Sequence, residues 1–293
     1  MKKTDIHLHL TFRQHPKTGQ MFVSSAEHML PHLRELSIEK GILMSSGEGH
    51  SSIPFGSNDE CRQIAEAFPG TYFWMCNLDD VPDNIFDRLN AYKEQGAVGI
   101  GELMINRRID DPLIQEIFAA AEKLSLPVLF HMSPEVGYEY GIVDDAGLPL
   151  LEESLKKYPD LKFIGHSQPF WHEISGDAAG ELSSRMEWGK GKVTPGGRLS
   201  YLFDTYPNLY GDLSANSGGC AIMRDETFGL SFLEKYCDRL MFATDMVNVD
   251  MEFPLGKWLE EMYQCGKLKE EVYRKIAYEN ADTLFGLHEK RRK

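Results

Sequence analysis

Two histidines near the start of the sequence, His7 and His9, stand one residue apart and are of a type that binds metal ions. Ile6, Leu8 and Leu10 alternate with them, as in a buried strand whose successive side chains point to opposite faces. The two imidazoles would then share one face, about 6.6 Å apart along the backbone. Imidazole nitrogens bond zinc at about 2.0 to 2.1 Å, so two converging rings can hold one ion. The alternative is a pair of core histidines, whose donors and acceptors would then need partners in an apolar setting.

Four further ionisable residues stand at points where an apolar run of the sequence stops. They are Glu102 in GIGEL, His131 in LFHMS, His166 in IGHSQ and Asp245 in FATDM. Each has an ordinary structural alternative. Glu102 could pair with a nearby arginine, Asp245 could cap a helix, and either histidine could be a core residue.

Short apolar segments alternate with helical segments along the whole chain, and eight of them have the character of strands that are apolar on both faces. This alternation predicts an α/β fold, a (β/α)8 TIM barrel formed by residues 1–293 as a single domain. The competing open sheet would bind a dinucleotide, but no glycine fingerprint follows the first strand. The predicted strand segments are 2–10, 41–46, 71–78, 97–104, 127–133, 161–168, 209–215 and 239–246.

The barrel prediction gives the polar residues a common location. All six lie at the carboxyl ends of predicted strands, which is the rim where barrel enzymes carry their chemistry. Independent structural roles would scatter such residues over the fold. We therefore expect one metal site at this rim.

Composition restricts the class of protein. The formal charge of -14 argues against a protein whose affinity depends on phosphate contacts, so we expect a small-molecule partner and no nucleic acid. The five cysteines are scattered without a Cys-x-x-Cys pair and are typical of reduced thiols in a cytoplasmic protein. No signal-peptide h-region follows the first residues, and no apolar run approaches the roughly 18 residues of a membrane helix.

Taken together, the segments TDIHLHL, LFHMS, FIGHSQ, FATDM and IAYENADTLFGL resemble the amidohydrolase superfamily in its amidohydrolase-related (type 2) branch. The resemblance spans nearly the whole chain. It implies a distorted (β/α)8 barrel that binds one divalent metal, commonly zinc, in a hydrolase or a non-oxidative decarboxylase. By this likeness His7, His9, His131 and Asp245 are the metal ligands, and His166 activates water or polarises the substrate.

The chemistry of these residues agrees with the resemblance. Neutral imidazoles and one carboxylate suit zinc or manganese, and zinc lowers the pKa of bound water to about 7. Asp245 or His166 would then move the proton. Glu102 occupies a position that bridges two metals in some branches and is no ligand in others, so a second ion through Glu102 stays open.

The leading prediction is a metal-dependent hydrolase of a small amide, ester or lactone. A decarboxylase of a small carboxylic acid is the alternative, and a barrel that binds metal without catalysis is a further one. Decarboxylation would be favoured by cations that hold a substrate carboxylate, and Arg13, Arg107 and Arg108 lie in the loops after the first and fourth strands. Surface arginines are, however, usually solvated.

The long irregular stretch 169–197 after the sixth strand is expected to select the substrate or to contact a second subunit of a homodimer. Phe170 and Trp171 would give an apolar wall over the metal, and His172 a hydrogen bond to the substrate. Alternatively, the two aromatic rings anchor this loop onto the barrel. His15, in the loop after the first strand, could also reach the substrate.

Overall fold

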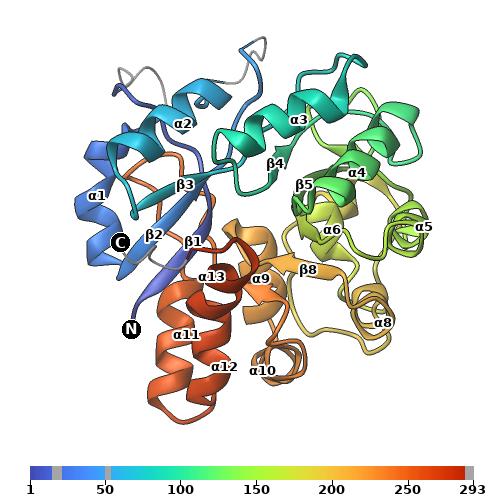
Figure 1. The fold of residues 1–293 in the computed structure, drawn as a ribbon. Helices are drawn as coiled ribbons and strands as arrows, with labels where there is room; N and C mark the ends of the chain where they lie inside the picture. Colours follow the sequence, from blue (N-terminus) through green and yellow to red (C-terminus); the bar gives the residue numbers. More distant parts are fainter. Residues whose placement is uncertain (15–21, 50–53, 288–293) are drawn as a thin grey trace.

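The computed structural model describes residues 1–14, 22–49 and 54–287, in which strands are followed by one or more helices up to a helical C-terminal segment (Figure 1). Seven of the eight predicted strand segments contain one strand, and the predicted segment 41–46 overlaps a strand that begins three residues earlier, at Ile38. A further short strand, β6 (Ile142–Val143), pairs with β5. The eight strands of the barrel are β1 (Lys3–Leu8), β2 (Ile38–Leu43), β3 (Tyr72–Trp74), β4 (Ile100–Leu103), β5 (Val128–Ser133), β7 (Phe163–His166), β8 (Leu209–Asp212) and β9 (Leu240–Met241).

Helices follow the strands, and α1, α2, α4 and α10 begin at a Ser or Asp side chain that accepts a hydrogen bond from a backbone N–H of the first turn. In α4, for example, the Asp111 side chain accepts a hydrogen bond from the backbone N–H of Leu113 at 2.9 Å, and Pro112 occupies the first turn. Within the described residues, no helix is both long and apolar enough to cross a membrane. The helices are α1 (Ala26–Glu35), α2 (Asn58–Ala67), α3 (Ile85–Glu94), α4 (Pro112–Leu124), α5 (Pro149–Lys157), α6 (Gln168–His172), α7 (Leu182–Arg185), α8 (Arg198–Thr205), α9 (Ala215–Met223), α10 (Glu226–Lys235), α11 (Leu255–Gln264), α12 (Glu270–Arg274), the π-helical turn η1 (Lys275–Glu279) and α13 (Asn280–Leu284).

All strand pairs are parallel and run in the order expected for a barrel. One ladder joins β1, β2 and β3, and a second joins β4, β5, β7, β8 and β9. Single bridges connect the two ladders at both edges, between Cys76 and Ile100 and between Leu8 and Met246. The strand ends therefore meet around one rim, as the predicted topology requires.

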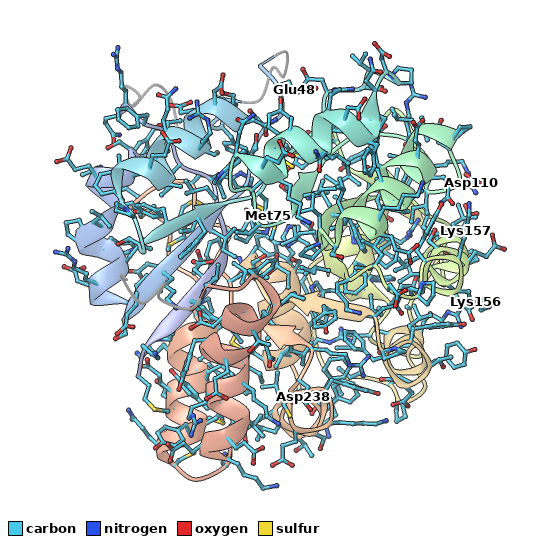
Figure 2. All side chains as sticks on the ribbon, viewed as in Figure 1. Glu48, Met75, Asp110, Lys156, Lys157 and Asp238 are labelled. Carbon is cyan, nitrogen blue, oxygen red and sulfur yellow. The ribbon has the colours of Figure 1, made fainter. Side chains whose placement is uncertain are left out.

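The barrel interior is a small hydrophobic core of its own, separate from the larger core between strands and helices. Met75, for instance, is buried in the interior while Asp110 and Lys156 lie at the periphery (Figure 2). Ile6 belongs to this interior core, whereas Leu8 packs outward against the helices. The expected strict alternation therefore breaks within β1, where the register with β2 shifts between Asp5 and Leu8.

Candidate metal centre

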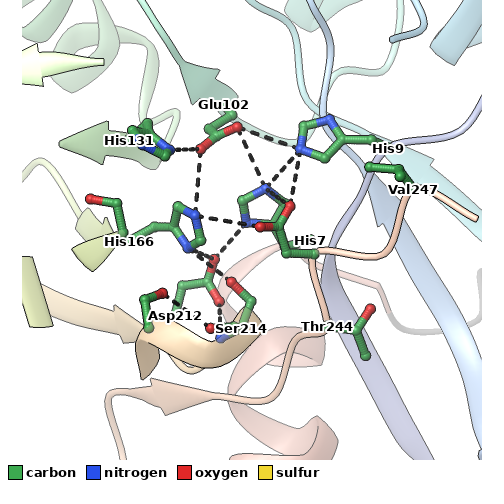
Figure 3. Close-up of polar contacts among 12 residues, drawn as sticks. His7, His9, Glu102, His131, His166, Asp212, Ser214, Thr244 and Val247 are labelled. Carbon is green, nitrogen blue, oxygen red and sulfur yellow. Dashed lines mark hydrogen bonds and ion pairs between the residues drawn. The ribbon is translucent and has the colours of Figure 1, made fainter. Parts of the chain in front are cut away.

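The six polar residues at the predicted strand ends lie together at the rim of the barrel (Figure 3). His131 and Asp245 are half-buried, and the other four side chains are buried. This proximity follows from the closed parallel topology, which brings the carboxyl ends of all strands to one end. The residues are His7 in β1, His9 just after β1, Glu102 in β4, His131 in β5, His166 in β7 and Asp245 after β9.

The first group of ligand atoms contains the His-x-His pair and Asp245. Nε2 of His7 lies 3.0 Å from Nε2 of His9, and Oδ1 of Asp245 lies 3.4 Å and 3.3 Å from these two nitrogens. Four ligands at about 2.1 Å from a tetrahedral ion are roughly 3.4 Å apart, so this spacing fits one ion. Oε2 of Glu102 lies 3.7 Å from His7 Nε2 and 3.4 Å from His9 Nε2, in position to be a fourth ligand.

The same Glu102 carboxylate also faces the other two histidines. Its Oε1 accepts a hydrogen bond from Nδ1 of His131 at 2.7 Å and lies 3.6 Å from Nε2 of His166. His131, which the resemblance assigns to the first ion, is thus grouped with Glu102 and His166. One ion fits the first group, and a second ion would use Glu102 as a bridge.

A carboxylate that the sequence analysis missed, Asp212 at the end of β8, holds both groups in place. Its Oδ2 accepts a hydrogen bond from Nδ1 of His7 at 2.7 Å and lies 3.3 Å from Nδ1 of His166. The Ser214 hydroxyl forms a hydrogen bond with the same His166 nitrogen at 2.8 Å. These contacts leave Nε2 of each ring directed into the centre. The signal was present in the sequence, because Asp212 also ends an apolar strand segment, LYGD.

Asp212→Asn is therefore expected to weaken metal binding by about 10- to 100-fold, the usual effect of removing a carboxylate partner of a ligating histidine. The amide is nearly isosteric, but it lacks the negative charge that holds the Nδ1 proton of His7, and its NH2 group favours the other tautomer when it faces the ring. Competition with a chromophoric chelator measures the affinity. An unchanged affinity at unchanged melting temperature would contradict a positioning role for Asp212.

A second buried carboxylate, Asp5, fixes the loop that carries Asp245. Its oxygens accept hydrogen bonds from the Thr244 hydroxyl at 2.6 Å and from the backbone N–H groups of Thr244 and His7 at 3.0 Å each. The Asp245 N–H donates to the carbonyl of His7 at 2.9 Å. Asp245 itself has φ of 61°, a left-handed conformation that aspartate tolerates better than most residues. The ligand loop is thereby tied to the strand that bears the histidine pair.

The ionisable side chains in the centre shift one another's pKa values. Burial raises the pKa of Glu102, but the charge and hydrogen bond of His131 outweigh burial and bring the pKa well below its usual value. Burial lowers the pKa of His7, but Asp245 and Asp212 raise it well above its usual value. The carboxylates thus stabilise a proton on His7, and a metal that binds here displaces that proton.

Two aromatic rings flank the centre. The Phe55 ring stacks on His9 with the centroids 4.1 Å apart, and the Tyr140 ring lies 4.5 Å from His131. Burial raises the pKa of Tyr140, and the nearby charges of Glu102 and Asp245 raise it further. Both rings come from loops after strands and were not predicted as site residues.

Residues 5–287 match the family model described as Amidohydrolase. The chain belongs to the amidohydrolase family. This match covers nearly the whole chain and confirms the resemblance of the strand-end motifs. The family is metal-dependent and includes both hydrolases and decarboxylases. No curated protein sequence matches the chain at a significant level.

Solved structures confirm the TIM-barrel fold of this amidohydrolase. The 2,6-dihydroxybenzoate decarboxylase from Rhizobium superposes with a TM-score of 0.64 at 17% identity, covering 98% of this chain and 99% of that one. A probable 2-pyrone-4,6-dicarboxylic acid hydrolase from Acinetobacter baumannii gives 0.60 at 13%, covering 98% and 100%. An uncharacterized TIM-barrel protein from Bordetella bronchiseptica gives 0.62 at 16%, covering 98% and 99%. At these identities the likeness shows the fold alone.

Two of the three arginines that could hold a substrate carboxylate already have partners within this amidohydrolase. Arg107 and Arg108 each form ion pairs with two carboxylates of the chain itself, so internal partners already neutralise their charge. Arg13 is exposed in the loop after β1, and His15 lies outside the described residues. The ion pairs are Arg107 with Asp80 at 3.0 Å and Asp111 at 3.1 Å, and Arg108 with Asp110 at 3.3 Å and Asp145 at 3.1 Å.

The aromatic pair after β7 is also placed differently from the predicted wall over the metal. Phe170 and Trp171 lie in α6 and are buried in the core. A Cβ at Gly165 would lie 2.2 Å from the Phe170 ring, and Nε1 of Trp171 donates to a β8 carbonyl at 2.9 Å. Both rings therefore anchor α6 onto the barrel. His172 donates to the Ala179 carbonyl at 2.9 Å and lines a cavity of about 270 Å³, and its role toward substrate stays a prediction.

Proposed function

We propose that this amidohydrolase is a metal-dependent hydrolase that cleaves an amide, ester or lactone bond in a small molecule. The observation that carries the proposal is the convergence of His7 Nε2, His9 Nε2 and Asp245 Oδ1 within 3.0 to 3.4 Å of one another. Two neutral imidazoles and a carboxylate at this spacing suit zinc or manganese. Asp245 keeps 27% of its side chain exposed, so the site stays accessible from the rim.

The residues of the chain have separate tasks in this reaction. When bound, the ion would polarise a carbonyl group and lower the pKa of a coordinated water molecule. His7, His9 and Asp245 would hold the ion, with Glu102 beside them. His166, whose Nδ1 is held by Ser214 and whose Nε2 faces the centre, would take the proton of the attacking water and return it to the departing nitrogen or oxygen as the carbonyl C–N or C–O bond breaks.

Hydrolysis ranks ahead of decarboxylation because two of the three candidate arginines are already paired within the chain. A substrate carboxylate needs a cation free to pair with it. Arg107 and Arg108 are already paired with carboxylates of the chain. Incubating the metal-loaded protein with a panel of lactones, esters, amides and hydroxybenzoates tests the proposal, with acid release and carbon dioxide release measured in parallel. Carbon dioxide release alone would replace hydrolysis by decarboxylation.

We expect close to one zinc or manganese ion per chain in protein purified without chelators. The first ligand group alone satisfies the spacing of one ion, and Glu102 then completes it. Elemental analysis with protein quantified by amino-acid composition measures the ratio. A ratio of two would make Glu102 a bridge and His131 and His166 ligands of the second ion, and a metal-free protein would contradict the proposed function.

The proposal also places the enzyme in the cytoplasm, acting on a small molecule. Its five cysteines are all free, as in proteins of reducing compartments. The charge of -14 disfavours binding to nucleic acid or to anionic membrane surfaces. A homodimer remains part of the proposal, and size-exclusion chromatography with light scattering tests it.

A further inference from the structure

A cavity of about 140 Å³ lies beside His131 at the rim of the barrel. Its walls come from the end of β5, the loop that follows β5, the first residue of α6 and Met186. Met132, Pro134 and Met186 make part of the lining apolar. Because His131 contacts Glu102, a molecule in this cavity would lie next to the metal centre.

Tyr140 is held firmly at the edge of this cavity. The neighbouring Gly141 has φ of 106°, and a Cβ there would lie 2.8 Å from Cδ2 of His131, so only glycine lets the backbone come so close. The Asn106 amide clamps the loop, because it donates to the Gly141 carbonyl at 3.0 Å and accepts from the N–H of Gly137 at 2.6 Å. The Tyr140 ring is thereby fixed against His131.

Besides the carboxylate of Glu139, which disfavours an anion here, two neutral polar groups face the cavity and keep their hydrogen-bonding capacity. Within the described part of the chain, the Tyr140 hydroxyl and the Gln168 side-chain amide have no hydrogen-bond partner. A phenol is protonated at neutral pH and can donate a hydrogen bond to a carbonyl oxygen. Polar groups that fix the orientation of a ligand are typical of small-molecule pockets.

We propose that this cavity is the substrate pocket, that it takes an uncharged cyclic carbonyl compound, and that Tyr140 donates a hydrogen bond to the carbonyl oxygen. The inference rests on the proposed hydrolase function and narrows its substrate class. A cavity of about 150 Å³ accommodates one benzene ring, so this pocket fits a six-membered lactone or lactam. As water adds to the carbonyl carbon, its oxygen gains negative charge, and the Tyr140 hydrogen bond strengthens.

Binding of δ-valerolactam, an uncharged six-membered lactam that resists hydrolysis, tests the pocket. Calorimetry on the metal-loaded protein should show that Tyr140→Phe weakens this binding about three- to tenfold, the effect of one lost hydrogen bond. Tyr201→Phe, on the exposed surface of α8, should bind the lactam like the wild type. Cyclohexanecarboxylate, which has a ring of the same size but a negative charge, should bind more weakly than the lactam. Equal lactam affinity in wild type and Tyr140→Phe, or no lactam binding at all, would overturn the assignment.

Hydrolysis of δ-valerolactone separates this inference from the proposed function. Tyr140→Phe should lower kcat about 10²- to 10³-fold, as loss of an oxyanion donor does, with metal content and melting temperature unchanged. Full activity in Tyr140→Phe would refute the role of Tyr140 and leave the hydrolase proposal standing. Conversely, Tyr140-dependent lactam binding in a protein that hydrolyses no ester, lactone or amide would support the pocket and refute the proposed function.

Discussion

Replacing His9 with alanine is expected to release the metal ion and to lower kcat at least about 10³-fold. His9 contributes the nitrogen 3.0 Å from that of His7, and without it the first ligand group keeps one imidazole beside the carboxylates. A catalytic metal contributes several kcal/mol of transition-state stabilisation, and about 1.4 kcal/mol corresponds to a factor of ten. Metal content and kcat measured on the same purified sample test the expectation.

Chelation provides an independent readout of the same loss. A ligand that binds only the folded state stabilises it, so EDTA should lower the melting temperature of the wild type and leave that of His9→Ala unchanged. His28→Ala is the matched control, because His28 is exposed on α1 and belongs to none of the candidate ligand groups. If His9→Ala kept its metal and its rate, the first ligand group would be wrongly assigned.

The positions of the strands could be predicted because each is a short run apolar on both faces. Such runs are typical of parallel strands covered by helices, and VLFHMS at β5 is an example. Which face of the sheet each side chain lies on was less predictable. Ile6 points into the barrel although Leu8 points outward, because the register shift within β1 depends on its pairing with β2. Pairing of that kind leaves no local trace in the sequence.

The rim residues could be predicted because topology alone brings strand ends together. Asp212 carried the same signal, an acidic residue at the end of an apolar run, and applying the rule to every strand would have found it. The partner of each side chain could not be predicted in this way. Glu102 divides its two oxygens between two pairs of histidines, which depends on rotamers and on strand register.

The loops were predicted least well, for a physical reason. Nothing local in the sequence distinguishes an arginine that is free to bind substrate from one that forms an ion pair within the chain. Arg107, which pairs with Asp80 at 3.0 Å, is of the second kind. Likewise, the Trp171 ring could line a pocket or pack in the core, and which of the two it does depends on where α6 begins. Because α6 starts two residues after His166, the ring turns back onto β8. The aromatic groups at the centre come instead from Phe55 and Tyr140, in loops with no strand-end pattern.

The role of His166 decides how the centre works. Its Nδ1 is held by the Ser214 hydroxyl at 2.8 Å, which leaves Nε2 facing Glu102 at 3.6 Å and Asp245 at 3.8 Å. The 3.8 Å between His166 Nε2 and Asp245 is longer than the 3.0 Å between the Nε2 atoms of His7 and His9. With one ion in that group, His166 is therefore placed to exchange protons beside the ion.

His166→Ala should accordingly keep its metal but lose about 10²- to 10⁴-fold in kcat, the usual contribution of a positioned acid or base. Ser214→Ala should give a smaller loss with the metal retained, because it frees the ring without removing the nitrogen that moves the proton. Single-turnover rates and metal content distinguish the two functions of His166. Loss of one of two ions in His166→Ala would show that His166 is a ligand, with His131 and Glu102, of a second ion. Asp245 would then carry out the proton transfer. Like that of Glu102, its carboxylate lies close to His7 and His9 in the first group and to His166 in the second.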